Sequence, residues 1–97
     1  MTLRSKTQQL CTWLGNQTQH QGISQENHAF CLLTKAYLEK LCNETTNGRA
    51  LGRALRDHHQ HLITHQHLLM NGTTDYKETF KRTVKYLENM LHIEDKR

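Results

Sequence analysis

Proline is absent from this 97-residue chain, and glycine occurs only five times. Both residues interrupt helices, so their scarcity favours an all-helical fold. No stretch approaches the roughly 18 consecutive apolar residues that a membrane span requires, and the first fifteen residues lack the apolar run of a secretory signal. We therefore expect a cytoplasmic protein that has no membrane partner.

Cysteine is also scarce, with three residues at positions 11, 31 and 42. Their number is odd and their spacing matches no common metal motif, so we expect reduced thiols in the core. Cys31 and Cys42 fall on one predicted helix, about 16 Å apart at ~1.5 Å per residue. That separation is too large for a disulfide within the helix.

Four apolar-periodic segments with polar joints between them predict helices at about 2–14, 25–44, 49–70 and 75–94. Ser24 is a favourable N-cap, Asn47-Gly48 opens the third helix and Asn71-Gly72 closes it. Asp75 and Glu78 resemble a capping box before the fourth helix. The short second and third joints predict a single domain over 1–97 that forms an antiparallel bundle, with two hairpins interlocked across a two-fold axis as the alternative.

The second predicted helix is apolar around more than half of its circumference. Its central stripe contains Phe30, Leu33, Tyr37 and Leu41, with Leu38 and Cys42 on one flank. A four-helix monomer of this size cannot cover so much apolar surface, so we expect a homodimer or larger assembly. The flanking residues Leu38 and Cys42 are the predicted interface.

The segment from Asp57 to His67 holds five of the eight histidines. Helical spacing places His58 and His65 on the buried stripe of the third helix, where we expect neutral imidazoles. His61 and His59 lie on its two shoulders, and His67 points to solvent. Buried histidines are usually satisfied by hydrogen bonds or stacking, and the same spacing also permits a pH-sensitive interface.

A metal site is a further interpretation of these histidines. His61 and His65 are spaced i, i+4, which lets one helix chelate an ion, with His58 or Cys31 as a third ligand. A cysteine far upstream of a His-x3-His pair resembles the small all-helical metalloregulators of the copper- and nickel-sensing type. That resemblance covers Cys31, His61 and His65 alone, with an interval between Cys31 and His61 longer than in that family, so it implies no membership.

Basic residues form two stripes on the third and fourth helices. Each could meet phosphates or the carboxylates of an acidic protein partner, although Glu78 and Glu88 interrupt the second stripe. The net charge of only +4 and the absence of a glycine-rich phosphate loop limit nucleic-acid contacts to the backbone. The candidate residues are Arg49, Arg53, Arg56, Lys77, Lys81 and Lys85.

The sequence offers no paired carboxylates, activated nucleophile or cofactor motif, so we expect no enzyme and no cofactor. The favoured function is a non-enzymatic protein-binding or regulatory module, such as a small adaptor, inhibitor or anti-regulator, that acts through a helical surface. The alternative is a basic helical accessory protein or regulator that contacts nucleic-acid phosphates. A histidine-based metal sensor ranks third.

Overall fold

The computed structural model describes residues 2–70 and 76–93, with side chains described at 2–66 and 76–93. This part of the chain contains four helices: α1 (Leu3–Gln17), α2 (Gln25–Glu44), α3 (Gly48–Met70) and α4 (Lys77–Leu91). It contains no strand. The predicted all-helical bundle of four helices is therefore confirmed.

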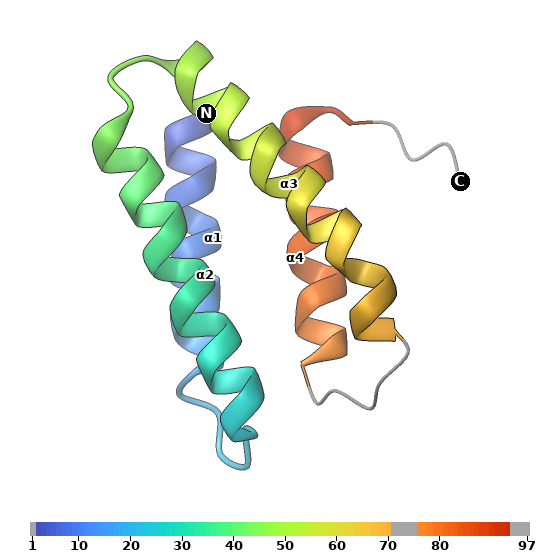
Figure 1. Ribbon diagram of the computed structural model, residues 1–97. Helices are drawn as coiled ribbons and strands as arrows, with labels where there is room; N and C mark the ends of the chain where they lie inside the picture. Colours follow the sequence, from blue (N-terminus) through green and yellow to red (C-terminus); the bar gives the residue numbers. More distant parts are fainter. Residues whose placement is uncertain (1, 71–75, 94–97) are drawn as a thin grey trace.

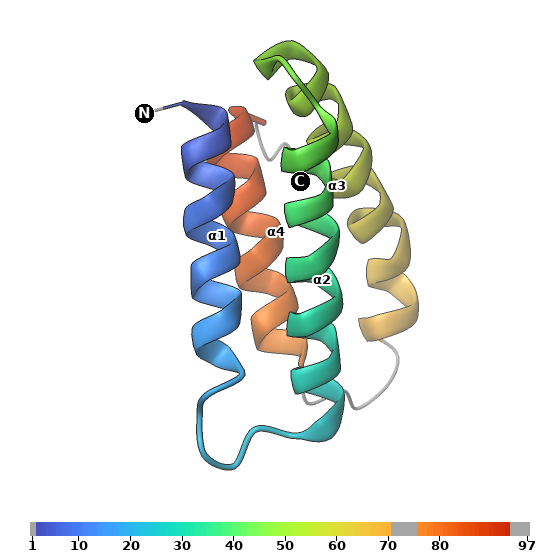
Figure 2. The same cartoon turned by 90° about the vertical axis from the view of Figure 1, so that its left-hand side faces the viewer.

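Successive helices run in opposite directions, as Figure 1 shows. α1 and α2 form one hairpin, α3 and α4 form the other, and α1 packs beside α4 (Figure 2). The Tyr86 hydroxyl on α4 joins the hairpins, since it donates to the Lys6 carbonyl oxygen of α1 at 3.4 Å. α3 starts close to α2 and moves away from it toward its own C-terminal end (Figure 1).

The core draws fully buried leucines from all four helices, because each helix has an apolar stripe that water would otherwise contact. α1 and α2 add the buried thiols of Cys11, Cys31 and Cys42, and all three cysteines are free. This matches the expectation of reduced core thiols. The fully buried leucines are Leu10, Leu14, Leu38, Leu51, Leu55 and Leu87.

Two predicted helix starts agree with the observed caps. The Ser24 hydroxyl accepts a hydrogen bond from the Asn27 amide at 3.1 Å, and the Asn47 side-chain oxygen accepts one from the Ala50 amide at 2.8 Å. These contacts satisfy amides that have no partner within the first helical turn. The caps thus set where α2 and α3 begin.

The predicted end of the first helix near Gly15 is wrong, because α1 continues to Gln17. A Cβ atom at Gly15 would lie 3.2 Å from the Lys35 Cε atom of α2. The glycine therefore leaves room for the Lys35 side chain between the two helices and does not end α1.

The fourth helix is also shorter than predicted. α4 begins at Lys77 and ends at Leu91, where His92 adopts a left-handed conformation with φ of 58°. Such a conformation ends a helix. The predicted roles of Asn71-Gly72 and Asp75 lie outside the described residues.

Two arginines close the C-terminal ends of neighbouring helices. The Arg4 guanidinium of α1 donates to the carbonyl oxygens of Cys42 and Thr45 at the end of α2. Arg56 of α3 donates to the Leu91 carbonyl oxygen of α4 at 3.2 Å. Each cation meets carbonyls that lack helical partners, at the negative end of the helix dipole.

Replacement of Arg56 by glutamine should lower the free energy of unfolding by about 1 kcal/mol, because the α4 terminus loses a charged hydrogen-bond donor. Arg53→Gln is the matched control, since Arg53 is exposed one turn away and makes no side-chain hydrogen bond to the described residues. Its effect should stay within about 0.5 kcal/mol. Urea denaturation measures both values, and equal losses would contradict the capping role.

Candidate functional site

The most unusual surface lies on the outer side of α2, where large apolar side chains meet solvent. Leu33 is 72% exposed and Tyr37 is 42% exposed, whereas their stripe neighbours Phe30 and Leu41 are partly buried. Exposed single apolar residues are common in proteins, but these two are consecutive on one helical face. They form the centre of the candidate site.

The predicted interface residues lie elsewhere. Leu38 is completely buried and Cys42 is 7% exposed, and both belong to the core of this same chain. They offer no surface to a second copy, so this part of the prediction is wrong. The physical reason is a rotation of α2: its predicted flank faces the core, and Leu33 and Tyr37 of its predicted central stripe turn outward.

One histidine of α3 borders this surface. The imidazole of His58 packs against the Tyr37 ring, with centroids 4.7 Å apart. Its Nε2 atom is buried and has no hydrogen-bond partner among the described residues. Burial, with smaller contributions from the nearby His61 and His59, lowers the pKa of His58 to about 4. His58 is therefore neutral at pH 7, as expected.

His59 is the most buried of the described histidines of the segment, in contrast to its predicted shoulder position. Its Nε2 atom lies 3.0 Å from the Glu88 carboxylate of α4, and both side chains are less than a tenth exposed. The sequence did contain a signal for this pair. Glu88 stands next to Leu87 on the apolar side of α4, and His59 follows Leu55 by one helical turn.

Two further histidines of α3 point away from the core. His61 and His65 are exposed, with ring centroids 5.9 Å apart, and the His65 Nδ1 atom donates to the His61 carbonyl oxygen at 2.9 Å. The predicted burial of His65 is therefore wrong, because α3 turns its His59 side toward α4. The side chain of His67 lies outside the described residues.

The four proposed metal ligands do not converge. Cys31 is fully buried, and its thiol donates to the Asn27 side-chain oxygen at 3.6 Å, whereas His61 and His65 face solvent. Within residues 2–66 and 76–93, no three side chains of histidine, cysteine, aspartate or glutamate are placed to hold a metal ion. The metal interpretation thus has no geometric support in this part of the chain.

The two basic stripes are displaced from each other along the bundle. Two contacts give the register of the antiparallel helices α3 and α4: Arg56 contacts Leu91, and His59 contacts Glu88. The same register places Lys85 of α4 opposite Leu62 of α3. That places Lys85 about 14 Å beyond Arg53 along the helix axis at ~1.5 Å per residue, more than the Debye length of ~8 Å in physiological salt. Arg49 lies another turn away from Lys85. The stripes therefore do not merge into one positive field.

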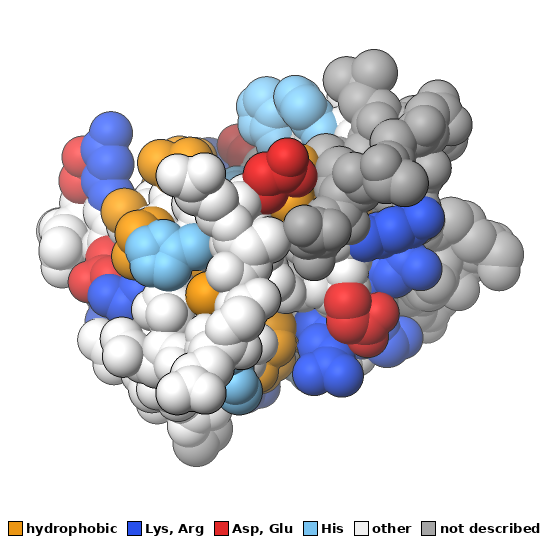
Figure 3. Space-filling model, turned by 90° about the horizontal axis from the view of Figure 1, so that it is seen from below, with side chains coloured by type: hydrophobic (Ala, Val, Ile, Leu, Met, Phe, Trp, Pro, Cys, Tyr) orange, Lys and Arg blue, Asp and Glu red, His pale blue; other side chains and the backbone are white. Residues whose placement is uncertain are grey.

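Local contacts weaken each stripe further. Arg56 caps α4, Lys77 is half-buried, and the neighbouring Arg82 lies 3.3 Å from Glu78. Lys81 and Lys85 remain exposed. Viewed from below, Figure 3 shows lysine and arginine side chains gathered on one side with an acidic side chain among them. Such a mixture is typical of a solvated helix face.

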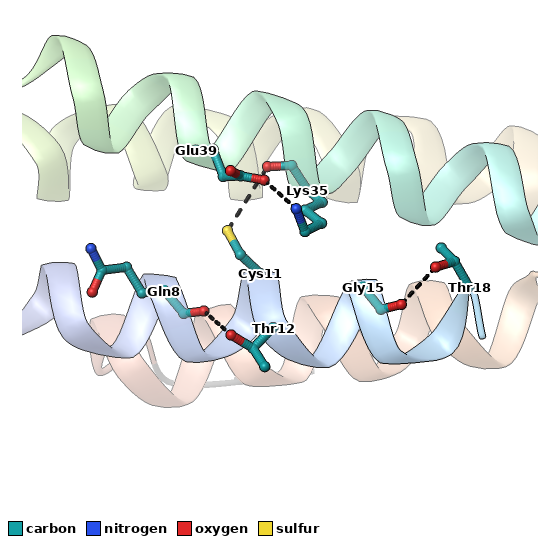
Figure 4. A network of polar contacts seen from close by, with 7 residues as sticks. All are labelled: Gln8, Cys11, Thr12, Gly15, Thr18, Lys35 and Glu39. Carbon is teal, nitrogen blue, oxygen red and sulfur yellow. Dashed lines mark hydrogen bonds and ion pairs between the residues drawn. The ribbon is translucent and has the colours of Figure 1, made fainter. Parts of the chain in front are cut away.

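A groove of about 260 Å³ separates α1 from α2 and contains the network in Figure 4. The Cys11 thiol donates to the Lys35 carbonyl oxygen at 3.8 Å, and the Lys35 ammonium lies 2.6 Å from Glu39. Burial, with a smaller contribution from Glu39, raises the pKa of Cys11 to about 11. Burial raises the pKa of Cys42 as well. Thiols in this state are protonated at neutral pH and are poor nucleophiles.

No family model, curated protein or solved structure matches this chain. In the part of the chain that the structure describes, no helix is both long and apolar enough to cross a membrane.

Acidification below pH 6.5 should reduce stability through His58. The unfolded chain binds this proton with a pKa near 6.5, whereas the folded pKa is about 4. The contribution of His58 to the free energy of unfolding is thus complete above pH 6.5 and is lost as the pH falls toward 4. The loss is at most about 2 kcal/mol, because solvent access to the side chain reduces the effect.

Thermal unfolding between pH 7.5 and 4 measures this effect in the native chain and in His58→Gln. The variant should lose less stability on acidification. His20→Gln, which changes an exposed loop histidine, should behave as the native chain does. Parallel curves for all three proteins would show that His58 has no such role.

Proposed function

We propose that this chain is a non-enzymatic protein-binding module that docks a partner on the exposed apolar face of α2. The observation that carries the proposal is the exposure of Leu33 and Tyr37 side by side on a regular, well-capped helix. A rigid helix that presents leucine and tyrosine supplies the anchors typical of protein interfaces.

The surroundings of this face support a protein partner. Exposed Glu26 and Lys40 lie on the same side of α2, toward its two ends. An apolar centre with a charged rim is the usual anatomy of a protein interface. Tyr37 is also held in place by its contact with His58, so little side-chain entropy is lost when a partner binds.

The nucleic-acid alternative has weaker support. Its six residues are split between two displaced stripes, and one of them, Arg56, already serves as a helix cap. The exposed tyrosine lies on α2, and α3 contains no phenylalanine, tyrosine or tryptophan to stack on bases beside its arginines. An adaptor or inhibitor that uses an apolar helical face fits the surface better.

The test is affinity capture from the native cell, with associated proteins, second copies of the chain and nucleic acid all measured. Leu33→Glu should reduce capture of the protein partner at least tenfold, because it places a charge in the apolar centre. Leu32→Glu is the matched control. It changes the adjacent leucine, which is 46% exposed but turned by about 100° around the helix, and it should retain the partner.

The double variant Arg49→Gln, Arg53→Gln separates the two functions. It should capture the same protein partner, and the native chain should show no submicromolar affinity for random duplex DNA at physiological salt. Tight duplex binding that disappears in this double variant would favour the nucleic-acid function. Full capture by Leu33→Glu would refute the α2 face.

A further inference from the structure

The exposed face of α2 has a palindromic pattern. Its members are all exposed, follow one another at intervals of three or four residues and centre on Leu33. A charge stands at each end, acidic near the start of the helix and basic near its end. The face consists of Glu26, Ala29, Leu33, Tyr37 and Lys40.

We propose that the partner on this face is a second copy of the chain, with its α2 antiparallel to the first across a two-fold axis at Leu33. The inference rests on the proposed function, since it names the occupant of the same surface. In a two-fold contact each residue meets its mirror position in the partner helix. Positions whose numbers add to 66 then face each other.

The register pairs residues that suit each other. Leu33 meets its own copy at the centre, and Ala29 faces Tyr37, so a small side chain makes room for a large one. Glu26 faces Lys40 at both ends, which gives two pairs of opposite charge. Both residues lie at the rim, where such charges set orientation more than affinity.

The opposite orientation is disfavoured by the same residues. In a parallel pair Glu26 would face Glu26 and Lys40 would face Lys40, so both ends would repel. Lys40 Nζ lies 4.0 Å from Glu44 in its own helix, with both side chains more than 60% exposed. Such a weak exposed pair can exchange for an intermolecular one.

The surface is accessible to a second helix. Leu38 and Cys42 attach the opposite side of α2 to the core, and Figure 2 shows α2 between α1 and α3 with no other helix in front of it. The face from Glu26 to Lys40 is about 21 Å long at ~1.5 Å per residue. One helix pair of that length buries less area than a standard interface, so we expect micromolar association.

The experiment is sedimentation equilibrium of the purified chain from about 1 to 500 μM. The average mass should rise from the 11.4 kDa monomer toward twice that value. Glu26→Lys alone and Lys40→Glu alone should each weaken association roughly tenfold, because both end pairs become repulsive. The double variant exchanges the charges and should recover affinity to within about threefold of the native chain.

Recovery in the double variant distinguishes an interface from a folding effect. Glu26→Lys removes an acidic residue from the first turn of α2, and the second substitution does not restore that helix-dipole contact. Leu33→Glu should abolish association, and Leu32→Glu should leave it unchanged. Circular dichroism should show all variants folded.

A monomeric mass up to the highest concentration would overturn the inference. So would a double variant that associates no better than the single variants. If the purified chain is monomeric but Leu33→Glu still loses a cellular protein, the α2 face binds a different partner and only the self-association fails. If Leu33→Glu loses nothing in the cell, the proposed function fails as well.

Discussion

The buried contact between His59 and Glu88 determines how the second hairpin is arranged. Both side chains are almost fully buried and lie 3.0 Å apart, so a different rotation of α3 would leave an unpaired polar group in the core. That rotation turns His61 and His65 to solvent and leaves His58 at the edge. The same register brings Arg56 to the end of α4.

The position of α3 also explains why α2 remains partly uncovered. Because α3 follows α4, it moves away from α2 along its length (Figure 1). α1 covers one side of α2 near Leu38 and Cys42, and α3 contacts Tyr37 through His58. Leu33, one turn before Tyr37, therefore remains 72% exposed. The candidate interface is a consequence of this splayed packing.

Local signals in the sequence were sufficient to predict the helices, but they could not predict how each helix is rotated. Ser24 and Asn47 act within three residues of their partners, so short-range chemistry identifies the starts of α2 and α3. Rotation depends on residues far apart in the sequence, such as His59 and Glu88. The apolar side chains of α2 cover a wider part of its circumference than the part that is buried. Periodicity therefore placed Leu33 at the centre of the buried face and Leu38 at its edge, the reverse of the observed arrangement.

The distribution of polar and apolar residues supports the proposal that a partner covers the α2 face. Thr7 and Thr83 are completely buried, and their hydroxyls donate to carbonyls of their own helices at 2.8 Å. Polar threonines thus fill core positions, whereas leucine and tyrosine stand at the surface of α2. In a free monomer the exposed side chains lose the benefit of burial, since each buried leucine contributes about 1.5–3 kcal/mol. The loss disappears when Leu33 and Tyr37 are buried against a partner, so an interface gives the exposed residues a physical reason to be apolar.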